Sequence, residues 1–442
     1  MDPLLGTLVL LLLALLGARF SFSTERVTGG PRLLFRTGIH FLALGFLLGP
    51  AGVGLLTEAA TAQLVPFLAL GLGWVGFHFG LQLDLRSLRR FPLSYHVLAA
   101  GQAVLTFGLF LAGGWLLLGP AGLRGEVPFL LVMGAAATAA VTTPAGIAMV
   151  SSNFLVRGNV RDLLFFTASL DAGIGILALE VTYALYRPEV AAAGVDVDPV
   201  LGVGLVGVAA GLGILCGIVF LWLTRTRPAA EELVLYLLGT CAFAAGAALQ
   251  WGLSPLFVAV VMGAVVANLD RDRQRIFSLL ERWEKPVYLT FLLLAGALLT
   301  VPTPGVVALA LAYALLRGLA KTSAAAILVS SLPMGFPVPR RLGLGLLPQG
   351  GISLAMAVSG VLMYTDLEMR GVNAESLLFT IIVIGVMLSE LTGPWLTVQV
   401  LRTAGEISPR VEEALARGDQ RRAEREALRH TSAPDRVKTD PE

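Results

Sequence analysis

Long apolar runs, separated by short polar stretches, follow one another along almost the whole chain. A helix that crosses the roughly 30 Å hydrocarbon layer of a membrane needs about 20 mostly apolar residues. Thirteen segments reach this length or come close, which predicts an all-α polytopic membrane protein with about 13 transmembrane helices. The segments are 4–19, 33–55, 64–83, 92–118, 127–150, 161–186, 199–223, 232–249, 253–269, 286–300, 304–330, 342–364 and 376–402.

The charges in the connecting loops give an independent test of this count, because cytoplasmic loops concentrate Lys and Arg. With the N-terminus placed outside, the internal loops carry 18 basic residues and the external loops only Arg124, Arg187 and Arg370. A missed or additional helix would invert the pattern after the error. The distribution therefore favours an outer N-terminus, a cytoplasmic C-terminus and insertion in the inner (plasma) membrane.

The two ends of the chain differ in character. The apolar run from Leu4 to Gly17 has no basic residues before it and no small-residue cleavage site, which indicates a retained first helix rather than a signal peptide. Residues 1–402 are expected to form the transmembrane domain. Residues 403–442 are polar and predict a cytoplasmic tail with a weak helix around 409–429; a regulatory or dimer-contact role is the alternative.

Composition agrees with a membrane protein and excludes several function classes. Of the 442 residues, 56% are hydrophobic and 14% charged, whereas a soluble domain carries roughly 25% charged residues. The net charge of +2 gives no basic excess for nucleic-acid binding. The two cysteines and four histidines show no metal-ligand spacing, and no nucleophile–base set or nucleotide motif suggests an enzyme or a cofactor.

Asp171 is the first candidate for function, because a charge inside the membrane is costly and marks a functional site by default. It lies about ten residues into segment 161–186, close to hydroxyl-bearing or small residues such as Thr167, Ser169 and Gly173. A buried carboxylate can bind a proton or a cation, but not both well, and this competition is what an antiporter needs. The alternative is a structural aspartate paired with Arg317 or Lys321.

Four other ionisable residues fall inside predicted helices. Arg317 and Lys321 are four residues apart and share one helix face, so they need an anionic partner, for which Asp171 is the first candidate and Glu390 the second. Glu180 lies nine residues after Asp171 and is expected to have a structural or vestibule role. Glu390 precedes Gly393-Pro394, and we expect it to cap a helix or form a pair within the bundle.

Two segments are interrupted near mid-span, one by Thr142-Thr143-Pro144 and the other by Pro348-Gln349-Gly350-Gly351. Broken backbone at membrane depth is tolerated only within protein or beside a watery cavity. If residues 4–186 and 232–402 are two repeats, each break falls in the fifth helix of its repeat. Matched breaks of this kind predict inverted repeats whose two discontinuous helices cross at the binding site.

Several local motifs resemble the cation:proton antiporter superfamily, the sodium/proton exchanger fold, over about residues 4–406. They are GFLLGPAGVGLL (45–56), GLQLDLRSLRR (80–90), VTTPAGIAMV (141–150), TASLDAGIG (167–175), GLSPLFVAVVMGAVVANL (252–269), LRGLAKTSAAA (316–326) and SELTGPWLTVQVLRTAGE (389–406). The resemblance implies an elevator-like exchanger, usually a homodimer, that moves Na⁺ or K⁺ against H⁺. It assigns Asp171 as the ion-binding carboxylate, Thr142 and Thr143 as crossover residues, and Lys321 or Arg317 as the core cation.

The chain departs from the family pattern beside the aspartate. Leu170 stands where many members carry an acid or Asn, Phe166 replaces another acid, and PQGGIS replaces an Arg-Gly-Glu-like motif. A single carboxylate suggests electroneutral one-for-one exchange, with Ser169 as an additional ligand. Two alternatives remain: a Kef-type potassium efflux transporter with a separate regulatory subunit, and a non-transporting membrane sensor on the same fold.

Overall fold

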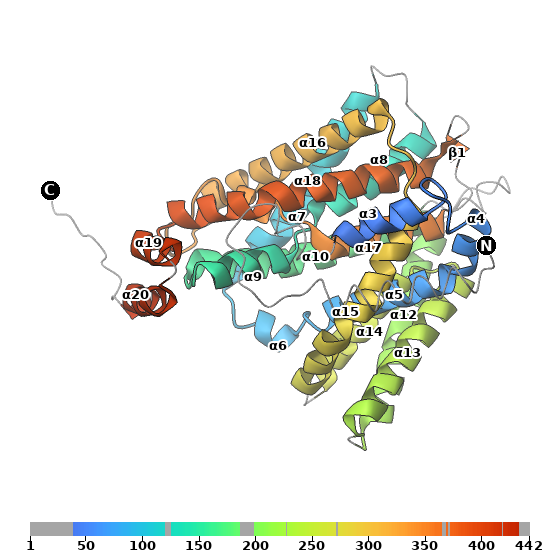
Figure 1. Cartoon of the computed structure of the whole chain (residues 1–442), viewed down its shortest axis with the longest axis horizontal. Helices are drawn as coiled ribbons and strands as arrows, with labels where there is room; N and C mark the ends of the chain where they lie inside the picture. The colour runs from blue at the N-terminus through green and yellow to red at the C-terminus, as the bar shows by residue number, and fades with distance from the viewer. Residues whose placement is uncertain are drawn as a thin grey trace.

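The computed structural model describes residues 39–119, 125–185, 199–226, 228–270, 273–364, 368–369, 372–417 and 419–432 (Figure 1). The predicted segment 4–19 lies outside them. The described chain is helical apart from one antiparallel hairpin, β1 (Glu368–Met369) and β2 (Val372–Asn373). The helices are α3 (Ile39–Leu48), α4 (Glu58–Gln63), α5 (Val65–Gly80), α6 (Leu85–Leu88), α7 (Leu93–Leu118), α8 (Glu126–Ala140), α9 (Pro144–Asn153), α10 (Asn159–Leu185), α12 (Pro199–Thr224), α13 (Ala230–Gln250), α14 (Pro255–Leu269), α15 (Arg273–Ala297), α16 (Pro304–Ser331), the 3₁₀ helix η1 (Leu342–Leu346), α17 (Gly350–Met363), α18 (Ala374–Thr403), α19 (Pro409–Ala416) and α20 (Gln420–Ser432).

The predicted all-α membrane class is confirmed. Eight helical spans of the described chain are long and apolar enough to cross a membrane, and three further apolar helices are shorter. Each of the predicted segments after 4–19 contains a described helix. The total of thirteen stays a prediction, since the first segment is not described.

Two boundaries differ from the expectation. The segment predicted at 286–300 belongs to α15, which begins at Arg273, because its first half is an amphipathic helix too polar for a hydropathy criterion. The tail forms two helices, α19 and α20, in place of one at 409–429. Their apolar residues Val411, Ala414 and Ala423 form a small cluster of their own against Leu155.

The helices form two bundles. We call α7, α8, α9, α10, α16, η1, α17 and α18 the crossing bundle, because they pack around the two interrupted segments. We call α3, α5, α12, α13, α14 and α15 the glycine-packed bundle; here α5 packs on α14, and α3 packs on α15. In Figure 1 most of the glycine-packed bundle lies in the lower part of the view, and α7, α8, α16 and α18 lie in the upper part.

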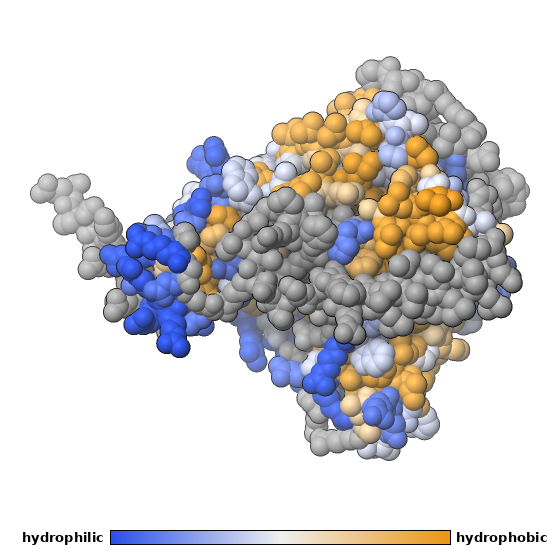
Figure 2. All heavy atoms as spheres, in the orientation of Figure 1, coloured by the Kyte–Doolittle hydropathy of each residue, from blue (hydrophilic) through white to orange (hydrophobic). Residues whose placement is uncertain are grey.

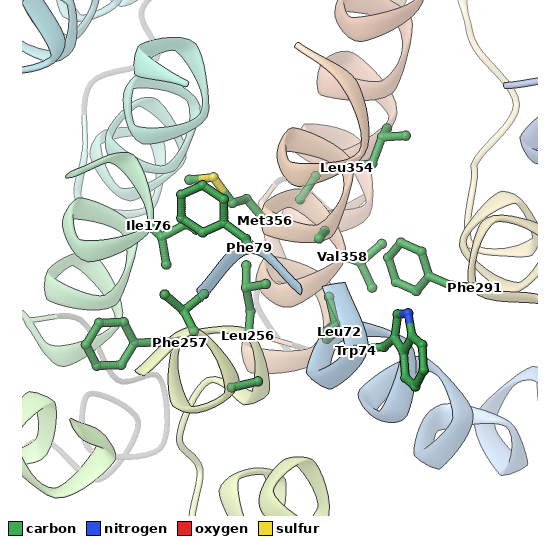
Figure 3. Packing of buried hydrophobic residues seen from close by; sticks show 14 of the residues in the cluster. Leu72, Trp74, Phe79, Ile176, Leu256, Phe257, Phe291, Leu354, Met356 and Val358 are labelled. Carbon is green, nitrogen blue, oxygen red and sulfur yellow. The ribbon is translucent and has the colours of Figure 1, made fainter. Parts of the chain in front are cut away.

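An apolar interface joins the bundles. Figure 3 shows Leu354, Met356 and Val358 of α17 between side chains of α5, α10, α14 and α15, including Leu72, Trp74 and Phe291. These side chains are almost completely buried. One hydrogen bond, between the hydroxyls of Ser254 and Ser359 at 3.1 Å, crosses the contact, and the rest of its strength comes from buried apolar area and packing. Such a contact is compatible with sliding, because apolar packing is not directional.

The outer surface agrees with insertion in lipid. Figure 2 shows apolar side chains over the sides of the bundles and hydrophilic side chains around α19 and α20. Large apolar residues on the sides of membrane-spanning helices are exposed, among them Leu315 and Leu319 of α16 and Trp222 of α12. An apolar surface of this size is unusual for a protein surrounded by water. These sides are suited to contact lipid chains.

Candidate functional site

The two predicted helix breaks are present and meet each other. Helix α8 ends at Ala140 and α9 starts at Pro144, while η1 ends at Leu346 and α17 starts at Gly350. The N–H of Thr143 donates to the carbonyl of Pro348 at 2.9 Å, which joins the two interruptions directly. We call the residues between these helix ends, 141–143 and 347–349, the crossing.

Gly350 is the position where the crossing needs a glycine. Its φ is +60°, in the left-handed region that side-chain-bearing residues rarely adopt. A Cβ there would also lie 2.9 Å from the side chain of Thr143. The next residue, Gly351, lies so close to the hydroxyl of Tyr288 that a Cβ there would force the Tyr288 side chain to move. The prediction that Pro144, Pro348, Gly350 and Gly351 mark discontinuous helices agrees with these positions.

Asp171 lies at the crossing with no exposed surface. Its carboxylate accepts a hydrogen bond from the N–H of Thr142 at 2.9 Å and lies 2.6 Å from the Thr142 hydroxyl. The Nζ of Lys321 is 3.0 Å away and also donates to the carbonyl of Ala140 at 2.6 Å. Asp171 and Lys321 therefore form an ion pair, as in the alternative of a paired aspartate that the sequence left open.

Arg317 ties both interrupted helices together. Its guanidinium, 1% exposed, donates to the carbonyls of Ala139 at 3.2 Å and Val141 at 2.8 Å, at the end of α8. It also donates to the carbonyl of Leu347 at 2.7 Å, beyond η1. These carbonyls have no helical partner because the helices stop there. One planar group with several donors satisfies them at once.

Glu390 supplies the fourth charge of the site. Its carboxylate accepts hydrogen bonds from the N–H groups of Gln349 at 3.2 Å and Gly350 at 2.9 Å, at the start of α17. The expected capping role fits this contact. The carboxylates of Asp171 and Glu390 therefore meet the starts of half-helices, and the cations of Lys321 and Arg317 meet their ends. This arrangement matches the sign of the helix dipole at each place.

Two predicted residues lie apart from this group. The hydroxyl of Ser169 donates to the carbonyl of Phe165 within its own helix, and no contact joins it to the carboxylate of Asp171. Glu180 is buried, at 4% exposure, and lies near Tyr183 toward the far end of α10. Leu170 packs against an apolar cluster rather than at the crossing.

A neutral polar group beside the crossing was missed by the sequence reasoning. Gln349 donates from Nε2 to the Tyr313 hydroxyl at 2.9 Å and to the Thr138 carbonyl at 3.1 Å. The hydroxyls of Tyr313 and Thr138 are 3.3 Å apart. Tyr313 could have been found, because it precedes Arg317 by four residues and shares its helix face. Thr138 resembles any other small residue of an apolar helix.

Glu406 was also missed as a contact of the helix that carries Asp171. It accepts hydrogen bonds from the N–H groups of Val160 at 2.6 Å and Arg161 at 2.9 Å, at the start of α10. Burial raises the pKa of this carboxyl, although the two N–H donors oppose the shift. Gly158 lies so close that a side chain there would occupy the same space as the carboxylate.

Comparison with known proteins gives one family and one fold. The sequence model of the transmembrane sodium/hydrogen exchanger family matches residues 8–401. Two structures of the sodium proton antiporter MjNhaP1 from Methanocaldococcus jannaschii, one determined at pH 8, are similar at TM-scores of 0.65 and 0.64. Both share 17% sequence identity with this chain and are covered completely, and they cover 91% and 92% of it. No curated protein sequence matches the chain. At this identity the structures show a shared fold.

Proposed function

The chain belongs to the transmembrane sodium/hydrogen exchanger family, and within this family we propose that it exchanges Na⁺ or K⁺ for H⁺ one for one at Asp171. The observation that carries the proposal is the fully buried carboxylate at the meeting point of two broken helices, bonded to Thr142 and Lys321. A dehydrated monovalent cation finds there a negative charge beside the hydroxyl oxygen of Thr142. A proton finds the same carboxylate.

The geometry around Asp171 supports competition between the cation and the ammonium of Lys321. The Nζ of Lys321 lies 3.0 Å from Oδ2 of Asp171. A cation that binds this carboxylate therefore competes with the Lys321 ammonium for it. The Thr142 hydroxyl also lies 2.9 Å from the carbonyl of Leu346. Since a hydroxyl has one proton, it can turn that proton to Leu346 and present its oxygen to the cation. Thr142 can thus contact the site both when Asp171 binds the proton and when it binds the cation.

Charge balance supports one-for-one exchange. Asp171, Glu390, Lys321 and Arg317 together carry two negative and two positive charges when all are ionised. Glu390 and Arg317 are committed to backbone groups of the broken helices. The carboxyl of Asp171 therefore gives up one proton when it accepts one cation, and Lys321 keeps its positive charge in both states. One positive charge then crosses the membrane in each direction, so the exchange moves no net charge.

We also propose the two inverted repeats, 4–186 and 232–402, within the transmembrane domain 1–402. Under this pairing of helices α3 corresponds to α14 and α5 to α15, and the packed pairs α3–α15 and α5–α14 exchange with each other. Likewise α10, with Asp171, corresponds to α18, with Glu390, and each acid meets the break of the preceding helix. The proposal includes a homodimer in the inner membrane, with the N-terminus outside and the tail 403–442 in the cytoplasm.

The test is exchange in proteoliposomes with an imposed pH gradient, with Na⁺ and K⁺ compared in turn. Asp171→Asn is expected to lower the initial rate by about a hundredfold or more, because the variant cannot alternate between proton and cation. Asp162→Asn is the matched control on the same helix; its side chain is 48% exposed. Wild-type rates in Asp171→Asn would contradict the proposal.

The same vesicles separate the remaining alternatives. With the membrane potential set by a K⁺ ionophore, the Na⁺-driven rate should not change if exchange is one for one. A rate that follows the potential would overturn the stoichiometry while leaving exchange itself intact. No exchange with either cation, together with no effect of either on thermal stability, would favour the sensor alternative. Exchange with K⁺ alone, dependent on an added subunit, would favour the Kef-type reading.

A further inference from the structure

A narrow cavity lies between α8, α10, α17 and α18, away from the crossing. Its lining includes Thr138 at one end and Glu375, Tyr183 and Tyr364 at the other. It has room for about one water molecule. Glu375 is the second residue of α18, and Glu390 follows it by 15 residues, roughly 22 Å along the helix. The cavity is therefore a separate place from the site at Asp171.

Glu375 is a buried acid without a countercharge among the described residues. It is 4% exposed, and none of the ion pairs in the described part of the chain includes it. A buried carboxylate left ionised and unpaired is costly. It therefore holds a proton or attracts a cation. Tyr183 on α10 interacts electrostatically with Glu375, and also with Glu180 on α10 and Tyr364 after α17.

Two tyrosines and Thr182 bring oxygen atoms to the part of the lining that contains Glu375, and most of the other lining residues are apolar. The hydroxyl of Tyr183, a residue 4% exposed, lies beside the hydroxyl of Ser359 and interacts electrostatically with Glu375. The hydroxyl of Tyr364 lies 3.4 Å from the carbonyl of Thr182. Hard cations prefer oxygen ligands of this kind. The backbone leaves the space open at Gly360, where a Cβ would lie 3.0 Å from Oε2 of Glu375.

The inner end of the cavity touches the polar group beside the crossing. Thr138 lines the cavity, and its hydroxyl and carbonyl contact Tyr313 and Gln349. The backbone N–H of Gln349 donates to Glu390. Thr138 is also four residues before Thr142, one helical turn from the break. The residues that line the cavity thus run from Glu375 to Thr138, which contacts the polar group beside the crossing.

We propose that Glu375, with the hydroxyls of Tyr183 and Tyr364, forms a second binding site for the exchanged monovalent cation. It holds the ion on the side of the membrane where α18 begins, before the ion reaches Asp171 or after it leaves. The inference rests on the proposed antiport. It assigns to Glu375 a role in affinity on one side, and to Asp171 the exchange step itself.

The test measures exchange while the cation concentration is varied on one side of the vesicle at a time. In Glu375→Gln the apparent KM for the cation should rise about tenfold on the side of the α18 start, with kcat within twofold of wild type. Gly360→Ala should act in the same direction by filling the site, and Glu375→Asp should restore part of the affinity. Glu231→Gln, an exposed acid at the start of α13, is the control.

The outcomes separate this inference from the proposed function. If wild-type protein exchanges ions and Glu375→Gln has unchanged KM on both sides, the second site is wrong and the antiport proposal stands. An equal rise on both sides, or a fall in kcat alone, also overturns the site, because a structural defect would do the same. If wild type exchanges nothing, the proposed function itself fails. Thermal unfolding of each variant checks that it is folded. If Glu375→Gln does not fold, the KM of Glu375→Asp is compared with wild type instead.

Discussion

In the crossing bundle polar and charged side chains fill the spaces between helices, whereas in the glycine-packed bundle the helix backbones themselves touch. Of the buried polar side chains that the structure describes, only Thr61, Asp84, Thr240 and Ser254 lie in or next to the glycine-packed bundle. There, Gly263 of α14 lies against the carbonyl of Phe77 in α5, and Gly296 of α15 against that of Leu42 in α3. Close approach of this kind strengthens dispersion contacts in lipid.

The difference shows how one chain can contain both a rigid support and a site that must change. Backbone contacts through glycine leave no polar group that a passing ion could disturb. Hydrogen bonds and ion pairs at the crossing are directional and can exchange partners, as at Thr142, where the hydroxyl reaches both Asp171 and Leu346. We therefore expect substitutions in the two bundles to affect stability and exchange in different proportions.

The largest effect is expected from Arg317→Met. The change leaves the carbonyls of Ala139, Val141 and Leu347 buried without their donor, at a cost of roughly 3–5 kcal/mol in unfolding free energy. Exchange should also be lost, because the broken helices are no longer held together. Arg341→Met, at an exposed position, is the control. Thermal unfolding in detergent that is unchanged in Arg317→Met would show that the crossing does not need the Arg317 guanidinium.

A smaller effect, confined to stability, is expected from Gly263→Ala. Its Cβ would overlap the backbone of Phe77, so α5 and α14 must separate, at about 1–3 kcal/mol. The KM for the cation should stay within twofold of wild type. Gly246→Ala on α13 is the matched control: a Cβ there meets nothing within 4 Å, and the substitution should be neutral or raise stability by up to about 1 kcal/mol. A large change of KM in Gly263→Ala would contradict the expectation that the glycine-packed bundle contributes to stability and not to exchange.

The smallest effect is expected from Glu406→Gln and depends on pH. Because the folded pKa of Glu406 is raised, its contribution to stability is full below the ordinary carboxyl pKa of about 4.3 and is lost as pH rises through the raised value. The unfolding temperature of wild type relative to Glu406→Gln should therefore fall with rising pH, by roughly 1–3 °C. Glu413→Gln, in the exposed part of α19, should show no such trend.

The parts of this structure that follow from local pattern could be predicted from the sequence, and the parts that depend on long-range contacts could not. Apolar length and proline position located the helices and both breaks, and membrane depth singled out Asp171, Arg317 and Lys321. The choice of Lys321 over Arg317 as the partner of Asp171 depends on where the broken helices place their carbonyls. Ser169 was expected at the site because it is near Asp171 in sequence, but its hydroxyl serves its own helix.

Glu375 and Glu406 illustrate a second limit. Both lie at helix ends, where an acid in the sequence suggests a solvated residue, whereas the packing of distant helices buries Glu375 and half-buries Glu406. The amphipathic start of α15 was missed for a related reason, since half of its surface is polar. Hydropathy averages a segment, whereas burial depends on which face meets another helix.

The ion pair of Asp171 and Lys321 joins residues 150 positions apart, and this separation bears on how the protein is made. At synthesis rates of about 5–20 residues per second, the ribosome needs roughly 8–30 s after Asp171 to add Lys321. During that interval the newly inserted helix carries a carboxylate whose partner does not yet exist. We therefore expect the Asp171 side chain to be protonated, or to lie near the lipid headgroups, until Lys321 has been added. Synthesis of the second half of the chain thus supplies the countercharge for the carboxylate in the first half.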